Sequence, residues 1–173
     1  MLDFKELFKS DIERYEGNIP QWNKKFSFLF RKNQTCKLFF LRKIYRKMYY
    51  KFIKKNGIEI EHNAKIGMGL YIGHPYNITV NPFAVIGDNC SLHKGVTIGQ
   101  ENRGIRKESP TLGNKVWIGV NATVVGKINI GDDVMICPNS FVNCNIPDHS
   151  IVLGNPCKII HKSNATDSYI TTK

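Results

Sequence analysis

The stretch IEIEHNAKIGMGLYIG (58–73) repeats one pattern every six residues: an aliphatic side chain comes first, and small or turn-forming residues follow it. The same period continues through VIGDNCSLHKGVTIG (85–99) and on to Pro147. Thirteen such units can be aligned, and each begins with Ile, Leu or Val: Ile60, Ile66, Ile72, Val80, Ile86, Leu92, Ile98, Leu112, Ile118, Val124, Ile130, Ile136 and Val142.

The other positions of the unit indicate how the chain turns. The second position is often Gly and the fourth is mostly Asn, Gly or Asp, which tolerate a positive φ, while the fifth is small or apolar. A helix with 3.6 residues per turn would place a six-residue period on different sides. A short strand and a corner, repeated three times per coil, instead close a triangular prism of stacked coils. An ordinary β-sandwich is the alternative, but it predicts no fixed period.

Two breaks in the repeat mark candidate functional loops. Two extra residues fall between Ile72 and Val80, and eight fall between Ile98 and Leu112. Because every coil stacks on its neighbours, extra residues must be pushed outward. We therefore expect function at these two places.

Composition narrows the class of protein. The chain has 173 residues, 42% of them hydrophobic, and it contains neither eighteen consecutive apolar residues nor the layout of a signal peptide. Its five cysteines have no CxxC spacing, and an odd number suits reduced thiols. We expect a cytoplasmic protein.

Positive charge is concentrated at the start of the chain. Residues 1–56 hold fifteen Lys and Arg against five Asp and Glu, a balance of +10 out of the total of +11. Apolar residues at helical spacing predict an amphipathic helix up to about Gly17, a second helix from about Lys24, and a third from Cys36 to Lys55. We therefore divide the chain into a basic helical segment (1–56), the prism (57–161) and a polar, frayed tail (162–173).

The third helix has one apolar face among many cations. The apolar face comprises Leu38, Leu41, Tyr45, Met48 and Phe52. It favours packing on the prism or on partner helices, but packing does not explain the charge. Three alternatives would explain the charge. Residues 36–55 could make peripheral contact with an anionic membrane, bind a polyanionic acceptor, or bind cofactor phosphates. No nucleic-acid recognition motif is present, so we expect no nucleic acid partner.

His74 is the candidate general base. It lies at an outward position next to Gly73 and Pro75, immediately before the first break in the repeat. An imidazole on a rigid coil can accept a proton near neutral pH. A surface histidine without function is the alternative, and the location at the break argues against it.

Residues 57–160 resemble the left-handed parallel β-helix acyltransferases of the hexapeptide-repeat superfamily, and within them the serine acetyltransferase family. The resemblance rests on GIEIEHNAKIG followed by GLYIGHP, on VIGDNCSLHKGVTIG, on PTLGNKVWIGVNATVVG and on GNPCKII. It implies the left-handed coil, a homotrimer and acetyl-CoA as co-substrate. It also implies that an acid fifteen positions earlier orients the catalytic histidine, which makes Glu59 the partner of His74. His74 would then remove a proton from an acceptor hydroxyl, without a covalent acyl-enzyme.

Two departures from the family bear on the acceptor. The family has a second active-site histidine before the proline of the extruded loop, where this chain has Ser109, and the helical segment here is short. These differences bring the chain closer to short relatives that acetylate sugars, so we predict a sugar hydroxyl in surface-polysaccharide assembly as the acceptor. Serine O-acetylation for cysteine biosynthesis is the main alternative, and a non-catalytic trimeric scaffold is the second.

The resemblance also implies binding residues. Those expected at the cofactor are Gly99, Gly119, Ala122, Gly154, Pro156 and Lys158. Those we assign to the substrate are Asn77, His93, Arg106 and Ser109. We expect no metal site, because zinc would need three converging histidines and an HxxxxH pair is absent.

Overall fold

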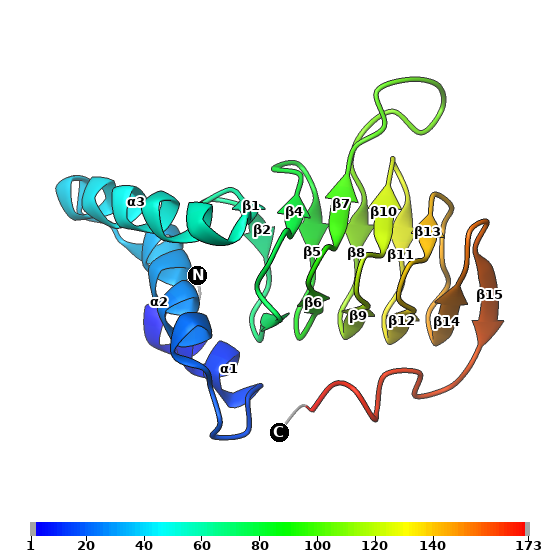
Figure 1. Ribbon diagram of the computed structural model, residues 1–173, viewed down its shortest axis with the longest axis horizontal. Helices are drawn as coiled ribbons and strands as arrows, with labels where there is room; N and C mark the ends of the chain where they lie inside the picture. Colours follow the sequence, from blue (N-terminus) through cyan, green and yellow to red (C-terminus); the bar gives the residue numbers. More distant parts are fainter. Residues whose placement is uncertain (1–2, 172–173) are drawn as a thin grey trace.

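The computed structural model describes residues 3–171 and consists of a parallel β-helix with helices at one end (Figure 1). The helical end contains α1 (Phe4–Glu13), α2 (Gln21–Thr35), α3 (Phe39–Ile53) and the 3-10 turn η1 (Lys54–Asn56). The loop between β7 and β8 projects from the prism, and the C-terminal tail runs back beneath it toward the helices. This confirms a mainly β fold with a helical N-terminal segment. Among the described residues, no helix combines the length and apolar character needed to cross a membrane.

Three parallel sheets form the faces of the prism. The first contains β1 (Glu59–Ile60), β4 (Thr79–Val80), β7 (Thr97–Gly99), β10 (Thr123–Val125) and β13 (Phe141–Val142) in that order. The second contains β2 (Lys65–Ile66), β5 (Val85–Ile86), β8 (Thr111–Leu112) and β11 (Asn129–Ile130). The third contains β3 (Tyr71–Gly73), β6 (Ser91–His93), β9 (Val116–Ile118), β12 (Val134–Ile136), β14 (Ser150–Leu153) and β15 (Lys158–His161), the last of which pairs antiparallel with β14.

The six-residue repeat builds this core as predicted. All thirteen aliphatic residues that begin a unit are buried, and the most exposed of them, Ile66, retains only 7% of its surface. From β1 to β10, each strand pairs with the strand three positions later, so side chains of the same unit position stack in columns. Positive φ angles occur at fourth positions such as Asn89, Asn121 and Asn139. The corners are therefore made where the sequence predicts them.

A buried polar network joins the helices to the first coil. The Asp11 carboxylate in α1 accepts hydrogen bonds from Arg31 Nε at 2.8 Å and from the Leu70 backbone N–H at 2.9 Å. The Arg31 guanidinium in α2 also donates to the carbonyl oxygens of Ile66 and Gly67. Both ionised side chains are fully buried. The helices thus cover the end of the prism and satisfy backbone groups that the first coil exposes.

The apolar face of α3 differs from the predicted one. Tyr49 and Ile53 are buried and Tyr45 is half-buried against the rest of the protein, whereas Leu41 and Met48 are exposed. The predicted stripe therefore does not pack as a unit, because the helix is rotated so that its tyrosines face inward.

The tail is ordered rather than frayed in the part that the structure describes. Ala165 and Thr166 donate backbone N–H groups to the Asp133 carboxylate at 3.0 and 2.9 Å, and the Thr166 hydroxyl donates to it at 2.7 Å. Burial raises the pKa of Asp133, but these hydrogen bonds and one with His149 outweigh it and lower the pKa to about 2. Tyr169 then packs against Trp117, with the rings tilted and their centroids 5.0 Å apart.

Candidate active site

The first break in the repeat is a tight corner that presents His74 to solvent. His74 follows β3 with φ of 55°, and its carbonyl oxygen accepts a hydrogen bond from Tyr76 N–H at 2.8 Å. The coils on either side hold the corner, since Tyr76 O accepts from Gly95 N–H and Asn77 N–H donates to Asn56 O, both at 3.0 Å. The imidazole is therefore exposed on a backbone that its neighbours fix.

His93 lies on the next coil, directly over Gly73. A side-chain carbon at Gly73 would stand 2.4 Å from Cδ2 of His93, so only glycine leaves room for this ring. His93 Nδ1 donates to the Ile118 carbonyl oxygen at 2.9 Å, which leaves Nε2 as an acceptor. Burial lowers the pKa of His93, and the nearby positive charge of His74 lowers it further. The two imidazoles are thus close enough to interact, and burial favours the neutral form of His93.

Glu59 lies on a different face of the prism from β3. It stands in register with Thr79 on the first sheet and is exposed. Within residues 3–171 no hydrogen bond or ion pair engages its carboxylate, and none joins it to His74. The predicted pairing of Glu59 with His74 therefore remains a prediction.

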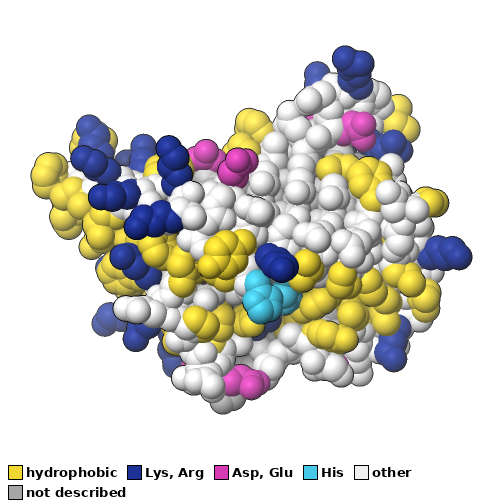
Figure 2. Space-filling view, viewed as in Figure 1, with side chains coloured by type: hydrophobic (Ala, Val, Ile, Leu, Met, Phe, Trp, Pro, Cys, Tyr) yellow, Lys and Arg dark blue, Asp and Glu magenta, His cyan; other side chains and the backbone are white. Residues whose placement is uncertain are grey.

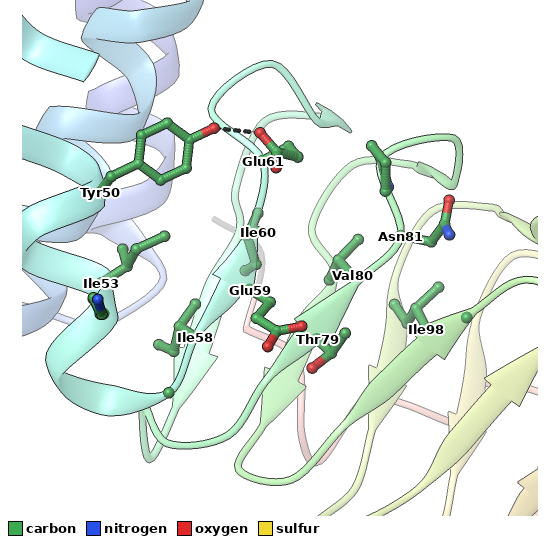
Figure 3. Close-up of a pocket in the computed structure, with 14 residues that line it drawn as sticks. Tyr50, Ile53, Ile58, Glu59, Ile60, Glu61, Thr79, Val80, Asn81 and Ile98 are labelled. Carbon is green, nitrogen blue, oxygen red and sulfur yellow. Dashed lines mark hydrogen bonds between the residues drawn. The ribbon is translucent and has the colours of Figure 1, made fainter. Parts of the chain in front are cut away.

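A pocket of about 570 Å³ covers the first sheet beside the end of α3 (Figure 3). Glu59 and Thr79 lie side by side in it, and Val80, Ile98 and Gly99 line it further along the sheet. At its edge, the Tyr50 hydroxyl is hydrogen-bonded to Glu61 and also contacts His62 Nδ1 at 2.8 Å. The volume falls within the range of roughly 300–1,000 Å³ that is usual for ligand sites.

The second break forms the extruded loop, which is tied to the prism at its base. Arg106 Nε lies 3.6 Å from the Glu101 carboxylate, and the Arg106 carbonyl oxygen accepts from Lys127 N–H at 2.9 Å. Lys127 Nζ lies 3.0 Å from the Glu108 carboxylate. Arg106 thus has an ion-pair partner within the loop instead of being a free cation.

Ser109 reaches the prism through Asn81, a residue that the sequence analysis missed. The Ser109 hydroxyl donates to Asn81 Oδ1 at 2.9 Å, and Asn81 also lines the pocket. The available signal was the position of Asn81, which follows Val80 directly and precedes a proline, where most units carry glycine. The pocket and the loop therefore meet at the Ser109–Asn81 hydrogen bond.

The residues predicted to bind the cofactor fall into two groups. Gly99 borders the pocket, whereas the Ala122 side chain is fully buried. A side chain at Gly119 would stand 2.6 Å from the Pro138 backbone nitrogen, so coil stacking already explains that glycine. The exposed turn between β14 and β15 holds Gly154 and Pro156, and Lys158 begins β15.

The four predicted substrate residues are not brought together within one chain. Asn77 lies against Gly57, because a side-chain carbon added at Gly57 would stand 2.6 Å from Asn77 Oδ1. Ser109 is instead hydrogen-bonded to Asn81. His93 lies beside Gly73 and Arg106 lies on the loop. No cluster of three or more potential metal ligands of the His, Cys, Asp or Glu type occurs in the part of the chain that the structure describes.

Sequence comparison identifies the proteins that this prism resembles. The family described as hexapeptide repeat of succinyl-transferase matches residues 53–74 and 111–144. A serine acetyltransferase of Helicobacter pylori is 42% identical over 106 residues, which are 61% of this chain and 62% of that protein. One of Synechococcus elongatus is 36% identical over 107 residues, which are 62% of this chain and 44% of that protein. The chain thus spans less than two thirds of the length of these curated relatives.

Solved structures confirm the fold. A serine acetyltransferase of Neisseria gonorrhoeae superposes with a TM-score of 0.76 at 24% identity, covering 92% of this chain and 67% of that one. The soybean serine acetyltransferase apoenzyme gives 0.74 at 23% identity, covering 91% and 69%. The chain is a left-handed parallel β-helix, as predicted, and its resemblance to hexapeptide-repeat acyltransferases of the serine acetyltransferase family is confirmed.

The comparisons correct the predicted acceptor. We expected a sugar hydroxyl in surface-polysaccharide assembly, but the relatives that match the prism are named serine acetyltransferases. The prediction was wrong because it gave too much weight to one loop position, Ser109, and to the short helical segment.

Proposed function

We propose that this chain, whose prism is similar to the serine acetyltransferases, is an acetyl-CoA-dependent O-acetyltransferase with L-serine as its acceptor. The observation that carries the proposal is the exposed imidazole of His74 on the fixed corner that breaks the six-residue repeat. The names of the relatives support the acceptor.

His74 acts as the general base. The acceptor hydroxyl gives its proton to a ring nitrogen of His74, so that the oxygen becomes nucleophilic as it bonds to the acetyl carbonyl carbon. Acetyl-CoA supplies the acetyl group, and the sulfur that leaves takes the proton back from the imidazolium. His74 is thereby neutral again, and no acyl-enzyme is needed.

Glu59 and His93 assist His74 in different ways. The carboxylate of Glu59 has no other partner among the described residues, so its charge is available to stabilise a nearby imidazolium. His93 stays neutral because burial lowers its pKa, which avoids a second positive charge beside His74. Both residues position or tune the base instead of reacting.

We place acetyl-CoA along the prism, from Gly99 toward β15. Gly99 borders the pocket and leaves room for the thin pantetheine arm, and Lys158 offers an exposed cation for phosphate. Because the four predicted substrate residues lie apart in one chain, we propose that three copies assemble and complete each site across their grooves. The odd number of cysteines suits a reducing compartment, so we place the reaction in the cytoplasm.

A non-catalytic scaffold remains the second candidate, because the acceptor-side histidine of the family is replaced by Ser109. The Ser109 hydroxyl is bonded to Asn81 at the pocket edge, so the position still presents a polar group where the loop meets the prism. A polar pair at this place suits the ammonium and carboxylate groups of an amino acid.

The test measures CoA release and O-acetyl-L-serine formation from acetyl-CoA. L-Serine is the acceptor, and L-alanine, which has the amine but lacks the hydroxyl, is the control. We expect saturable product formation with L-serine and none with L-alanine. A chain that is folded and trimeric but releases no CoA with L-serine would support the scaffold and overturn the proposal.

A further inference from the structure

Residues 38–48, the N-cap and the first ten residues of α3, include large apolar side chains that are exposed. Six of them lie between residues 38 and 48 and retain between 39% and 74% of their surface: Leu38, Phe39, Phe40, Leu41, Ile44 and Met48. These residues are at the free end of the helix, away from the prism (Figure 1). A contiguous apolar patch of this kind marks an interaction surface.

The exposed side of α3 also carries positive charge without any negative charge. Residues 36–56 contain eight Lys and Arg and no Asp or Glu. Figure 2 shows apolar and basic side chains intermingled at this end of the molecule. Lys43, Lys47 and Lys51 are exposed, and Lys43 Nζ lies 4.4 Å from the ring centroid of Phe39.

Helical spacing places the two kinds of side chain next to each other. Phe40, Ile44 and Met48 follow one another at intervals of four residues and form one ridge, and Lys43, Lys47 and Lys51 form the adjacent ridge. The inward-facing Tyr45, Tyr49 and Ile53 lie on another side of the helix. The outer surface is therefore amphipathic in its own right.

We propose that the outer face of α3 binds the surface of an anionic phospholipid membrane, with the Phe40–Ile44–Met48 ridge inserted among the acyl chains and the lysine ridge at the headgroups. Apolar and aromatic residues flanked by Lys and Arg are the combination that interfacial helices use. This inference is independent of the acetyl-transfer proposal.

Two other occupants fit less well. In a symmetric contact with a second copy, the same lysines would meet each other, and α3 has no carboxylate to offset the repulsion. A nucleic acid would satisfy the cations, but it would not bury the aliphatic side chains of Ile44 and Met48. A bilayer surface satisfies both ridges.

The test is cosedimentation of the intact chain with vesicles, either of phosphatidylcholine alone or of equal parts phosphatidylcholine and phosphatidylglycerol. We expect binding only to the anionic vesicles, and weaker binding at high salt because screening shortens the range of the attraction. The variant Lys43→Gln/Lys47→Gln/Lys51→Gln should bind about 100-fold more weakly, since each lysine near an anionic surface contributes about 1 kcal/mol. Phe40→Ser/Ile44→Ser should also lose binding.

The matched control is Lys115→Gln/Lys127→Gln/Lys162→Gln, which removes the same charge from exposed positions on the prism and at the start of the tail and should bind like the wild type. Failure of the wild-type chain to bind anionic vesicles at low salt would overturn the proposal. So would equal losses in the two lysine variants. Retained binding of Phe40→Ser/Ile44→Ser together with competition by single-stranded RNA would point to a polyanion site instead. An α3-mediated dimer in solution that Phe40→Ser/Ile44→Ser dissociates would assign the face to a second copy.

Discussion

The prism and the helical end hold themselves together by different physical means. In the prism, thirteen aliphatic residues point into one continuous apolar column, and the charge over residues 57–173 is only +1. At the helical end the charge is +10, and a buried ion pair between Asp11 and Arg31 links two helices to the first coil. In the prism the candidate base lies where the repeat is broken, whereas the outer face of α3 stays exposed for other contacts.

The largest expected effect tests whether the break in the prism carries the chemistry. His74→Ala removes the general base and should lower kcat by about 10²–10⁴-fold, while the thermal midpoint stays unchanged because His74 is exposed. Steady-state CoA release with L-serine measures this. The control His161→Ala removes another exposed histidine, on β15, and should keep full activity. Unchanged turnover in His74→Ala would remove the base from the mechanism.

The next effect concerns the stability of the helical end. Asp11→Asn leaves the buried charge of Arg31 without its partner and should lower the free energy of unfolding by about 3–5 kcal/mol. Glu13→Gln breaks only the exposed contact with Lys9, at 3.7 Å, and should cost less than about 1 kcal/mol. Urea titration compares the two variants. Equal costs would mean that the network is not what attaches the helices.

A smaller effect returns to the prism. Glu59→Gln removes a negative charge from the site without changing its shape, and it should lower kcat/KM about tenfold, which corresponds to about 1.4 kcal/mol. Glu13→Gln, an exposed carboxylate in α1, is again the control and should leave kcat/KM unchanged. If Glu59→Gln matches the wild type, the carboxylate has no part in activating His74.

The smallest effect is the docking of the tail. Because the folded pKa of Asp133, about 2, lies below the ordinary aspartate value of about 3.9, its stabilisation is present above about pH 4 and is lost as the pH falls toward about 2. Trp117 fluorescence in a Trp22→Phe background should report loss of the Tyr169 contact over that range. Asp133→Asn should show the Trp117 fluorescence of the undocked tail already at neutral pH. Asp167→Asn, a change within the tail, should not. Identical spectra for all chains would contradict this role of Asp133.

The prism could be predicted from the sequence because its cause is periodic. The buried first positions, the positive-φ corners at Asn89 and Asn121, and the extruded loop all follow from counting residues in sixes. The end of the prism was harder to predict, because β14 and β15 extend the third sheet after Pro147, where the six-residue period is lost. Local spacing is sufficient only where each coil repeats the previous one.

The parts that escaped prediction depend on contacts between distant residues. Arg31 binds carbonyl oxygens of the first coil, Asp133 binds the tail, and Ser109 bonds to Asn81, and none of these pairings has a periodic signal. His74 and the loop were found because they lie at breaks in the repeat. The acceptor was predicted wrongly because a single loop residue does not reveal the geometry around it.

The most direct test of the central claim is the position of the CoA sulfur in a crystal structure of this chain with CoA. We predict a trimer in which the sulfur lies beside a ring nitrogen of His74, within the reach of about 3–3.5 Å that a reacting pair requires, and in which the pantetheine arm passes Gly99. A CoA molecule bound with its sulfur away from His74, or a trimer whose grooves are filled by side chains, would contradict this prediction.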